Sequence, residues 1–72
     1  MAGEAIRSPG TGRVVEVHVA AGTVVREGAE LILLESMKME IPVLAPRDAV
    51  VVVVHVGVGA SVHEGEDLLT LR

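Results

Sequence analysis

The chain repeats itself, and this repeat constrains the fold more than any other feature of the sequence. Residues 9–34 align with residues 46–71 at a constant offset of 37 residues, without a gap. Internal repeats define the structural unit of a fold, and two copies are too few for a solenoid. We therefore predict one domain, residues 1–72, with approximate two-fold symmetry. The identical pairs are Pro9/Pro46, Val14/Val51, Val15/Val52, Val17/Val54, His18/His55, Val19/Val56, Gly22/Gly59, Val25/Val62, Glu27/Glu64, Gly28/Gly65, Leu31/Leu68 and Leu34/Leu71.

Both copies contain a valine-rich segment with the period-two pattern of a half-buried strand. We expect these strands at residues 14–19 and 50–56. β-Branched residues favour strands because their stiff side chains suit the pleat. The predicted inner faces hold Val15, Val17 and Val19 in the first strand and Val52, Val54 and Val56 in the second, and the outer faces hold Val14, Glu16, His18, Val51, Val53 and His55.

Glycine-marked turns separate further short strands, which we expect at residues 31–36, 39–44 and 68–71. Pro42 lacks a backbone donor, so the strand that contains it is predicted at a sheet edge. No segment has a helical period. Many short strands between glycine turns indicate an all-β sandwich or flattened barrel.

Composition excludes several classes of protein. The 72 residues include no cysteine, so disulfides and thiolate metal sites are excluded. They include no aromatic residue, so the core must consist of Val, Leu, Ile, Ala and Met, and nucleic-acid binding by base stacking is excluded. The net charge of −4 also argues against a phosphate-binding surface. The longest apolar stretch, Ala49–Val54, is too short for a membrane span, and Met1–Arg7 lacks the apolar run of a signal peptide, so we expect a cytoplasmic protein.

Lys38 lies between two methionines in the link that joins the two copies. Because strands are expected on both sides, this lysine is predicted at a hairpin tip, where a partner protein has access to it. Two simpler interpretations stay open: Lys38 as an ordinary solvated turn residue, and the methionines as core filling, above all Met39. His18 and His55 are equivalent in the repeat, but they are predicted on different strands without a third ligand, so we expect no metal site. No catalytic constellation is visible.

The run Glu35-Ser36-Met37-Lys38-Met39-Glu40 resembles the biotinylation motif of biotin carboxyl carrier and biotinyl domains, usually Glu-Ala-Met-Lys-Met. The resemblance covers nearly the whole chain and is closest to the small stand-alone biotinylated proteins of actinobacteria. Ser36 departs from the usual alanine, and Asp48-Ala49 stands where the family commonly has glycine. The other matching positions are Ser8-Pro9, Gly12, Val14-Val15, Gly22, Gly28 and Ala45-Pro46.

The resemblance implies a flattened barrel of two four-stranded antiparallel sheets with quasi-two-fold symmetry, with the modified lysine on an exposed hairpin. It implies no protruding thumb loop. It further implies that a biotin protein ligase attaches biotin to Lys38 through an amide, and that Glu35, Ser36, Met37, Met39 and Glu40 serve recognition.

The implied function is a non-catalytic carrier that takes CO2 from a biotin carboxylase to a carboxyltransferase, as in acyl-CoA carboxylases. The acceptor stays open, as does the choice between a separate subunit and a part of a larger enzyme. We expect a monomer without nucleic-acid or membrane partners, although Val51 and Val53 leave a weak dimer open. The alternatives are a lipoyl-type carrier, against which Met37 and Met39 argue, and an unmodified adaptor domain.

Overall fold

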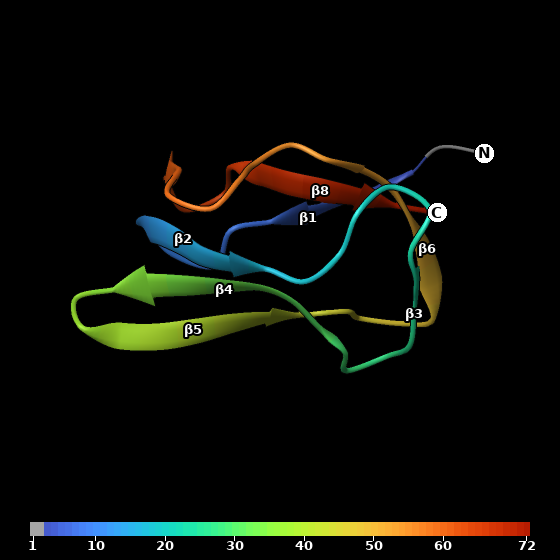
Figure 1. The fold of residues 1–72 in the computed structure, drawn as a ribbon, viewed down its shortest axis with the longest axis horizontal. Helices are drawn as coiled ribbons and strands as arrows, with labels where there is room; N and C mark the ends of the chain where they lie inside the picture. The colour runs from blue at the N-terminus through green and yellow to red at the C-terminus, as the bar shows by residue number, and fades with distance from the viewer. Residues whose placement is uncertain (1–2) are drawn as a thin grey trace.

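This computed structural model describes residues 3–72 of the chain. These residues contain eight short strands and no helix (Figure 1). No helix in this part is therefore long and apolar enough to cross a membrane. The strands are β1 (Glu4–Arg7), β2 (Gly12–Val17), β3 (Val24–Val25), β4 (Glu30–Ser36), β5 (Met39–Leu44), β6 (Ala49–Val54), β7 (Ser61–Val62) and β8 (Asp67–Leu71).

The strands form two four-stranded sheets, ordered β1-β8-β6-β3 and β5-β4-β2-β7, and every pairing is antiparallel. This confirms the predicted all-β class. Strand β5 lies at an edge, as Pro42 requires, because only one side of an edge strand needs backbone donors. The molecule is elongated, with extents of 35 × 19 × 17 Å, and the β4–β5 turn lies at one end of the long axis (Figure 1). Strand β1 begins and β8 ends towards the other end.

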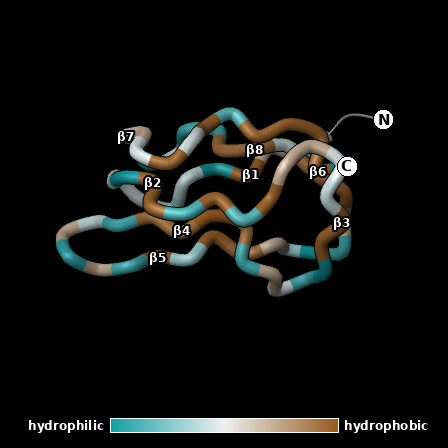
Figure 2. The backbone as a smooth tube through the Cα atoms, in the orientation of Figure 1, coloured by the Kyte–Doolittle hydropathy of each residue, from teal (hydrophilic) through white to brown (hydrophobic). Residues whose placement is uncertain are grey.

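The core between the sheets is aliphatic throughout. Figure 2 shows hydrophobic residues along β4, β6 and β8, whereas hydrophilic and moderately hydrophobic residues alternate around the β4–β5 turn. Methionine takes no part in the core within residues 3–72, contrary to the expectation from composition. The core residues are Ile6, Val14, Val25, Leu31, Ile32, Leu34, Val43, Ala45, Ala49, Val51, Val62, Leu68, Leu69 and Leu71.

Two β-bulges overturn part of the predicted side-chain pattern. Val14 and Val51, predicted on outer faces, are each 1% exposed, while Val52, predicted inside, is 42% exposed. The pairing of β2 with β4 shifts between Val14 and Glu16, and that of β6 with β8 shifts between Val51 and Val53. A bulge inserts one residue and reverses the alternation beyond it, so residues on either side of the bulge can both face inward. The later inner positions Val17, Val19, Val54 and Val56 pack against the core as predicted, whereas Val15 is only half-buried and lies outside the core cluster.

Equivalent turns in the two halves hold each other in place. The Gly22 amide donates to the Val51 carbonyl at 2.7 Å, and the Gly59 amide donates to the Val14 carbonyl at 2.8 Å. Both glycines have positive φ, 92° and 93°, which side chains resist. Each half therefore closes its turn on a strand of the other half.

The second pair of equivalent contacts involves side chains. The Glu27 amide donates to Asp48 Oδ1 at 2.8 Å, and the Glu64 amide donates to Thr11 Oγ1 at 3.2 Å. The Asp48 carboxylate, at a turn where the sequence departs from the family pattern, therefore satisfies a backbone amide of the other half. Asp48 follows Arg47, which also pairs with Glu4 at 3.0 Å.

Gly12 lies where β2 approaches β4 too closely for a side chain. A Cβ at this position would be 2.4 Å from the Glu35 carbonyl oxygen. We expect Gly12→Ala to lower the free energy of unfolding by about 1–3 kcal/mol, because overpacking forces the strands apart. Chemical denaturation measures this loss.

Gly57→Ala is the matched control, since a Cβ there meets no atom within 4 Å. This variant is expected to be neutral or slightly stabilising, because alanine restricts the unfolded chain. An equal decrease in the free energy of unfolding in the two variants would contradict the close approach of β2 and β4.

Candidate functional site

Met37 and Lys38 form the two-residue turn between β4 and β5. The last cross-strand pairs are Glu35 with Glu40 and Ser36 with Met39, so these two residues alone close the hairpin. Both have positive φ, 51° for Met37 and 66° for Lys38, and they are the only non-glycine residues in the described part of the chain that do. This is the signature of a type I′ turn, whose twist matches that of the strands it joins.

The turn is built from residues that resist its backbone conformation. Type I′ turns favour Asn-Gly or Asp-Gly, and the left-handed conformation costs other L-residues about 1–2 kcal/mol each. Strained backbone of this kind gathers at functional sites, where the surrounding structure holds it in place. Met37 and Lys38 thus occupy a turn whose backbone conformation is unfavourable for them. Their presence there points to a role for their side chains.

All three side chains at the tip are exposed to solvent. Met37 is 93% exposed and Met39 is 66% exposed, so the interpretation of Met39 as core filling is wrong. Lys38 is also exposed, and no carboxylate in residues 3–72 lies within ion-pair distance of its ammonium group. Lys38 is moreover the only lysine in the sequence, in which all other basic residues besides histidine are arginines. The tip therefore presents a single unpaired amine between two exposed thioethers.

The stem of the hairpin is tied to the start of β2 and to Thr11, the residue before it. Ser36 Oγ donates to the Thr11 carbonyl at 2.6 Å, and Gly12 lets the Glu35 backbone approach. Thr11 in turn accepts from the Glu64 amide of the other half. Ser36, the residue that departs from the usual family motif, thus contributes a hydrogen bond that alanine cannot make. The sequence patterns did not predict that Thr11 supports the hairpin, because its partner Ser36 lies 25 residues away.

Glutamates flank the tip on both strands. Glu35 and Glu40 are directly opposite one another, and Arg13 of β2 is the neighbour of Glu35 on the other side. Like charges in opposite positions of a sheet are unfavourable, and the strand pairing places the positively charged Arg13 beside Glu35. The predicted recognition residues Glu35, Ser36, Met37, Met39 and Glu40 therefore all lie within one or two positions of the turn.

The two equivalent histidines lie away from the tip and differ from one another. His18 contacts Glu16 and Glu30, whereas His55 lies 3.4 Å from the Thr70 hydroxyl. Glu30 was not anticipated as a neighbour, because it meets His18 only through the pairing of β2 with β4. The tip and this cluster are separate features of the surface.

Replacing Lys38 by glycine tests whether the tip is strained. Relief of the left-handed conformation gains about 1–2 kcal/mol, and the greater freedom of unfolded glycine offsets about 0.5–1 kcal/mol. We expect Lys38→Gly to raise the free energy of unfolding by roughly 0.5–1 kcal/mol. Lys38→Arg keeps the strain and the charge, so its stability should be unchanged. A loss of stability in Lys38→Gly would show that the lysine side chain stabilises the turn.

Comparisons with known proteins agree with this geometry. Residues 1–71 match the biotin/lipoyl family described as "Biotin-requiring enzyme". The biotinylated protein TB7.3 homolog of Mycolicibacterium smegmatis is 55% identical over 42 residues, which cover 58% of this chain and 59% of that protein. The matched segments span less than two thirds of each curated relative, from 8% to 59% of its length.

Two solved structures show the same fold. A single-chain, multi-domain long-chain acyl-CoA carboxylase superposes with a TM-score of 0.91 at 38% identity, over 96% of this chain and 7% of that one. The lipoyl domain of the 2-oxoglutarate dehydrogenase complex from Azotobacter vinelandii superposes with a TM-score of 0.76 at 29% identity, over 86% of this chain and 78% of that domain. The chain belongs to the biotin/lipoyl attachment family, as a small carrier domain related to the biotin carriers of carboxylases.

Proposed function

We propose that this domain carries biotin in amide linkage to Lys38 and delivers CO2 from a biotin carboxylase to a carboxyltransferase. The observation that carries the proposal is the tip itself: one unpaired lysine, the only one in the chain, held in a strained turn between two exposed methionines. The names of relatives, a biotinylated protein and a carboxylase, support biotin as the attached group. We also propose that the domain acts in the cytoplasm.

The attachment step needs a partner enzyme. A biotin protein ligase supplies biotin as an acyl-adenylate, the Lys38 Nζ attacks the acyl carbon, the amide bond forms and AMP leaves. A lysine in water is mostly protonated at neutral pH, and an ammonium group has no lone pair with which to attack. No carboxylate in residues 3–72 pairs with Lys38, and we propose that the ligase provides the base that accepts the proton.

The position of the tip suits a carrier. The turn lies at one end of the 35 Å long axis, so an arm attached there can enter a partner's active site while the body of the domain stays outside (Figure 1). Tethering raises the effective concentration of carboxybiotin at each partner. The domain contributes position, and the partners contribute the catalytic groups.

Moving the lysine tests whether a biotin protein ligase recognises the hairpin tip. We expect Lys38→Arg, co-expressed with a biotin protein ligase, to lose all streptavidin binding and to keep the circular dichroism spectrum of the parent. The double variant Lys38→Arg/Arg13→Lys restores one amine on the neighbouring strand and should also stay unmodified. Biotin on the double variant would mean that the ligase accepts any exposed amine of this domain, and biotin on the single variant would refute Lys38 as the site.

The methionines are expected to select biotin over lipoate. Met37→Asp/Met39→Ala keeps Lys38 but removes both exposed thioethers, so initial rates of biotinylation should fall at least tenfold, equivalent to about 1.4 kcal/mol of barrier. Rates are measured with purified ligase and labelled biotin. The same variant is offered to a lipoate ligase. An unchanged biotinylation rate would show that the ligase does not read the methionines.

A further inference from the structure

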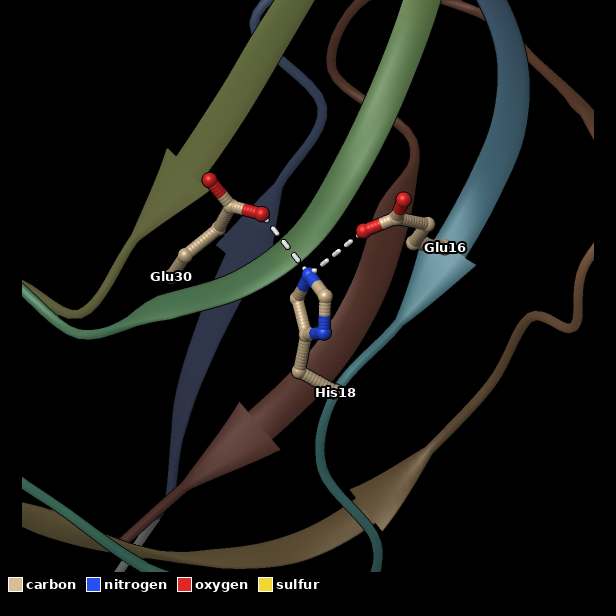
Figure 3. A network of polar contacts seen from close by, with 3 residues as sticks. All are labelled: Glu16, His18 and Glu30. Carbon is tan, nitrogen blue, oxygen red and sulfur yellow. Dashed lines mark hydrogen bonds and ion pairs between the residues drawn. The ribbon is translucent and has the colours of Figure 1, made fainter.

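A second cluster of side chains with ligand chemistry lies on the sheet formed by β2 and β4. His18 Nε2 is 2.7 Å from Glu30 Oε2 and 3.1 Å from Glu16 Oε1. Figure 3 shows the two carboxylates, from different strands, both reaching the same ring nitrogen. Glu16 belongs to β2, His18 follows that strand, and Glu30 begins β4. The proposed biotin site does not involve these residues.

A single hydrogen bond accounts for only one of the two contacts to this ring nitrogen. A ring nitrogen carries at most one hydrogen, which can lie along the line to one oxygen but not to both. A metal ion can take the nitrogen lone pair and one oxygen from each carboxylate at the same time. In a tetrahedral site with bonds of about 2.1 Å the ligand atoms are about 3.4 Å apart. The three atoms here all lie within 4.8 Å of one another, so small side-chain rotations suffice.

The charge of the cluster favours a cation. Two carboxylates carry a charge of −2 when the imidazole is neutral. In the described part of the chain neither Glu16 nor Glu30 pairs with an arginine or with Lys38, and His18 is the one basic group within ion-pair distance of either carboxylate. The arginine-paired acids, Glu4 and Asp67, lie elsewhere. Among the described residues, His18 is therefore the one group that can offset this negative charge, and it does so only when its ring is protonated.

The backbone holds the three ligands in place before any ion binds. The His18 amide donates to the Leu31 carbonyl at 2.9 Å, and Val17 pairs with Ile32. Leu31 and Ile32 are fully buried. The side chains themselves are between 38% and 54% exposed, which leaves room for water as the remaining ligands.

We propose that Glu16, His18 and Glu30 form a surface site for a divalent transition-metal ion such as Zn2+, completed by water. One imidazole and two carboxylates form a ligand set that suits Zn2+, Ni2+ or Cu2+ better than Mg2+ or Ca2+, which prefer oxygen alone. The bound ion would join β2 to β4, the strand that leads to the lysine turn. It stabilises the folded state, because the unfolded chain does not hold the three ligands together.

The repeat supplies a matched control within the same molecule. His55 is the equivalent of His18, but Val53 stands in the place of Glu16 and Asp67 in the place of Glu30. His55 faces the Thr70 hydroxyl instead of two carboxylates. His55 should therefore bind no ion.

The experiment is a Zn2+ titration of tag-free protein without biotin, followed by NMR of the histidine ring resonances and by thermal melting. We expect saturable shifts of the His18 resonances, little change at His55, and a rise in Tm that EDTA reverses. His18→Ala and Glu16→Gln should each weaken binding at least tenfold, while His55→Ala should bind as the parent does. Mg2+ at the same concentration should shift neither histidine.

Three results would overturn the site. The first is the absence of saturable binding up to millimolar Zn2+. The second is an equal loss of Zn2+ affinity in His18→Ala and His55→Ala. The third is Zn2+-induced resonance shifts that are the same at both histidine rings. Circular dichroism of each variant separates a lost site from a lost fold. None of these readouts depends on modification of Lys38, so failure of either proposal leaves the other standing.

Discussion

Burial of β4 is the interaction on which the rest of the structure depends. Leu31, Ile32 and Leu34 are 0–1% exposed, and this strand pairs with β2 on one side and β5 on the other. Fully burying a side chain of this size contributes about 1.5–3 kcal/mol. The same strand runs out of the core through Glu35 and Ser36 into the exposed turn. A rigid core is thereby connected directly to the one lysine of the chain.

The contrast between core and tip explains how a strained turn persists. Type I′ geometry at Met37 and Lys38 is unfavourable for both residues, and neither gains burial from it. The stem compensates through paired strands, the Ser36–Thr11 hydrogen bond and the close approach at Gly12. Local sequence preference and local structure disagree here, and such disagreement is expected where side chains are retained for function.

The sequence predicted the fold class and the hairpin but not the details that bulges and register determine. Pro42 identified an edge strand because the missing donor is a property of one residue. The inner and outer faces around Val14 and Val51 were wrong because a bulge changes the alternation without changing the residue pattern. Strands β3 and β7 have two residues each, too few to produce a period. The contact between His18 and Glu30 depends on the pairing of two strands. The alternation of residues within one strand does not predict that pairing.

Intact mass spectrometry can determine whether Lys38 is the attachment point of biotin. The protein is co-expressed with a biotin protein ligase and biotin, weighed, and then mapped by peptide fragmentation. We expect a mass increase of one biotinyl group, located on the peptide that contains Met37-Lys38-Met39. An unchanged mass, or a biotinyl group on the amino terminus instead of Lys38, would contradict it.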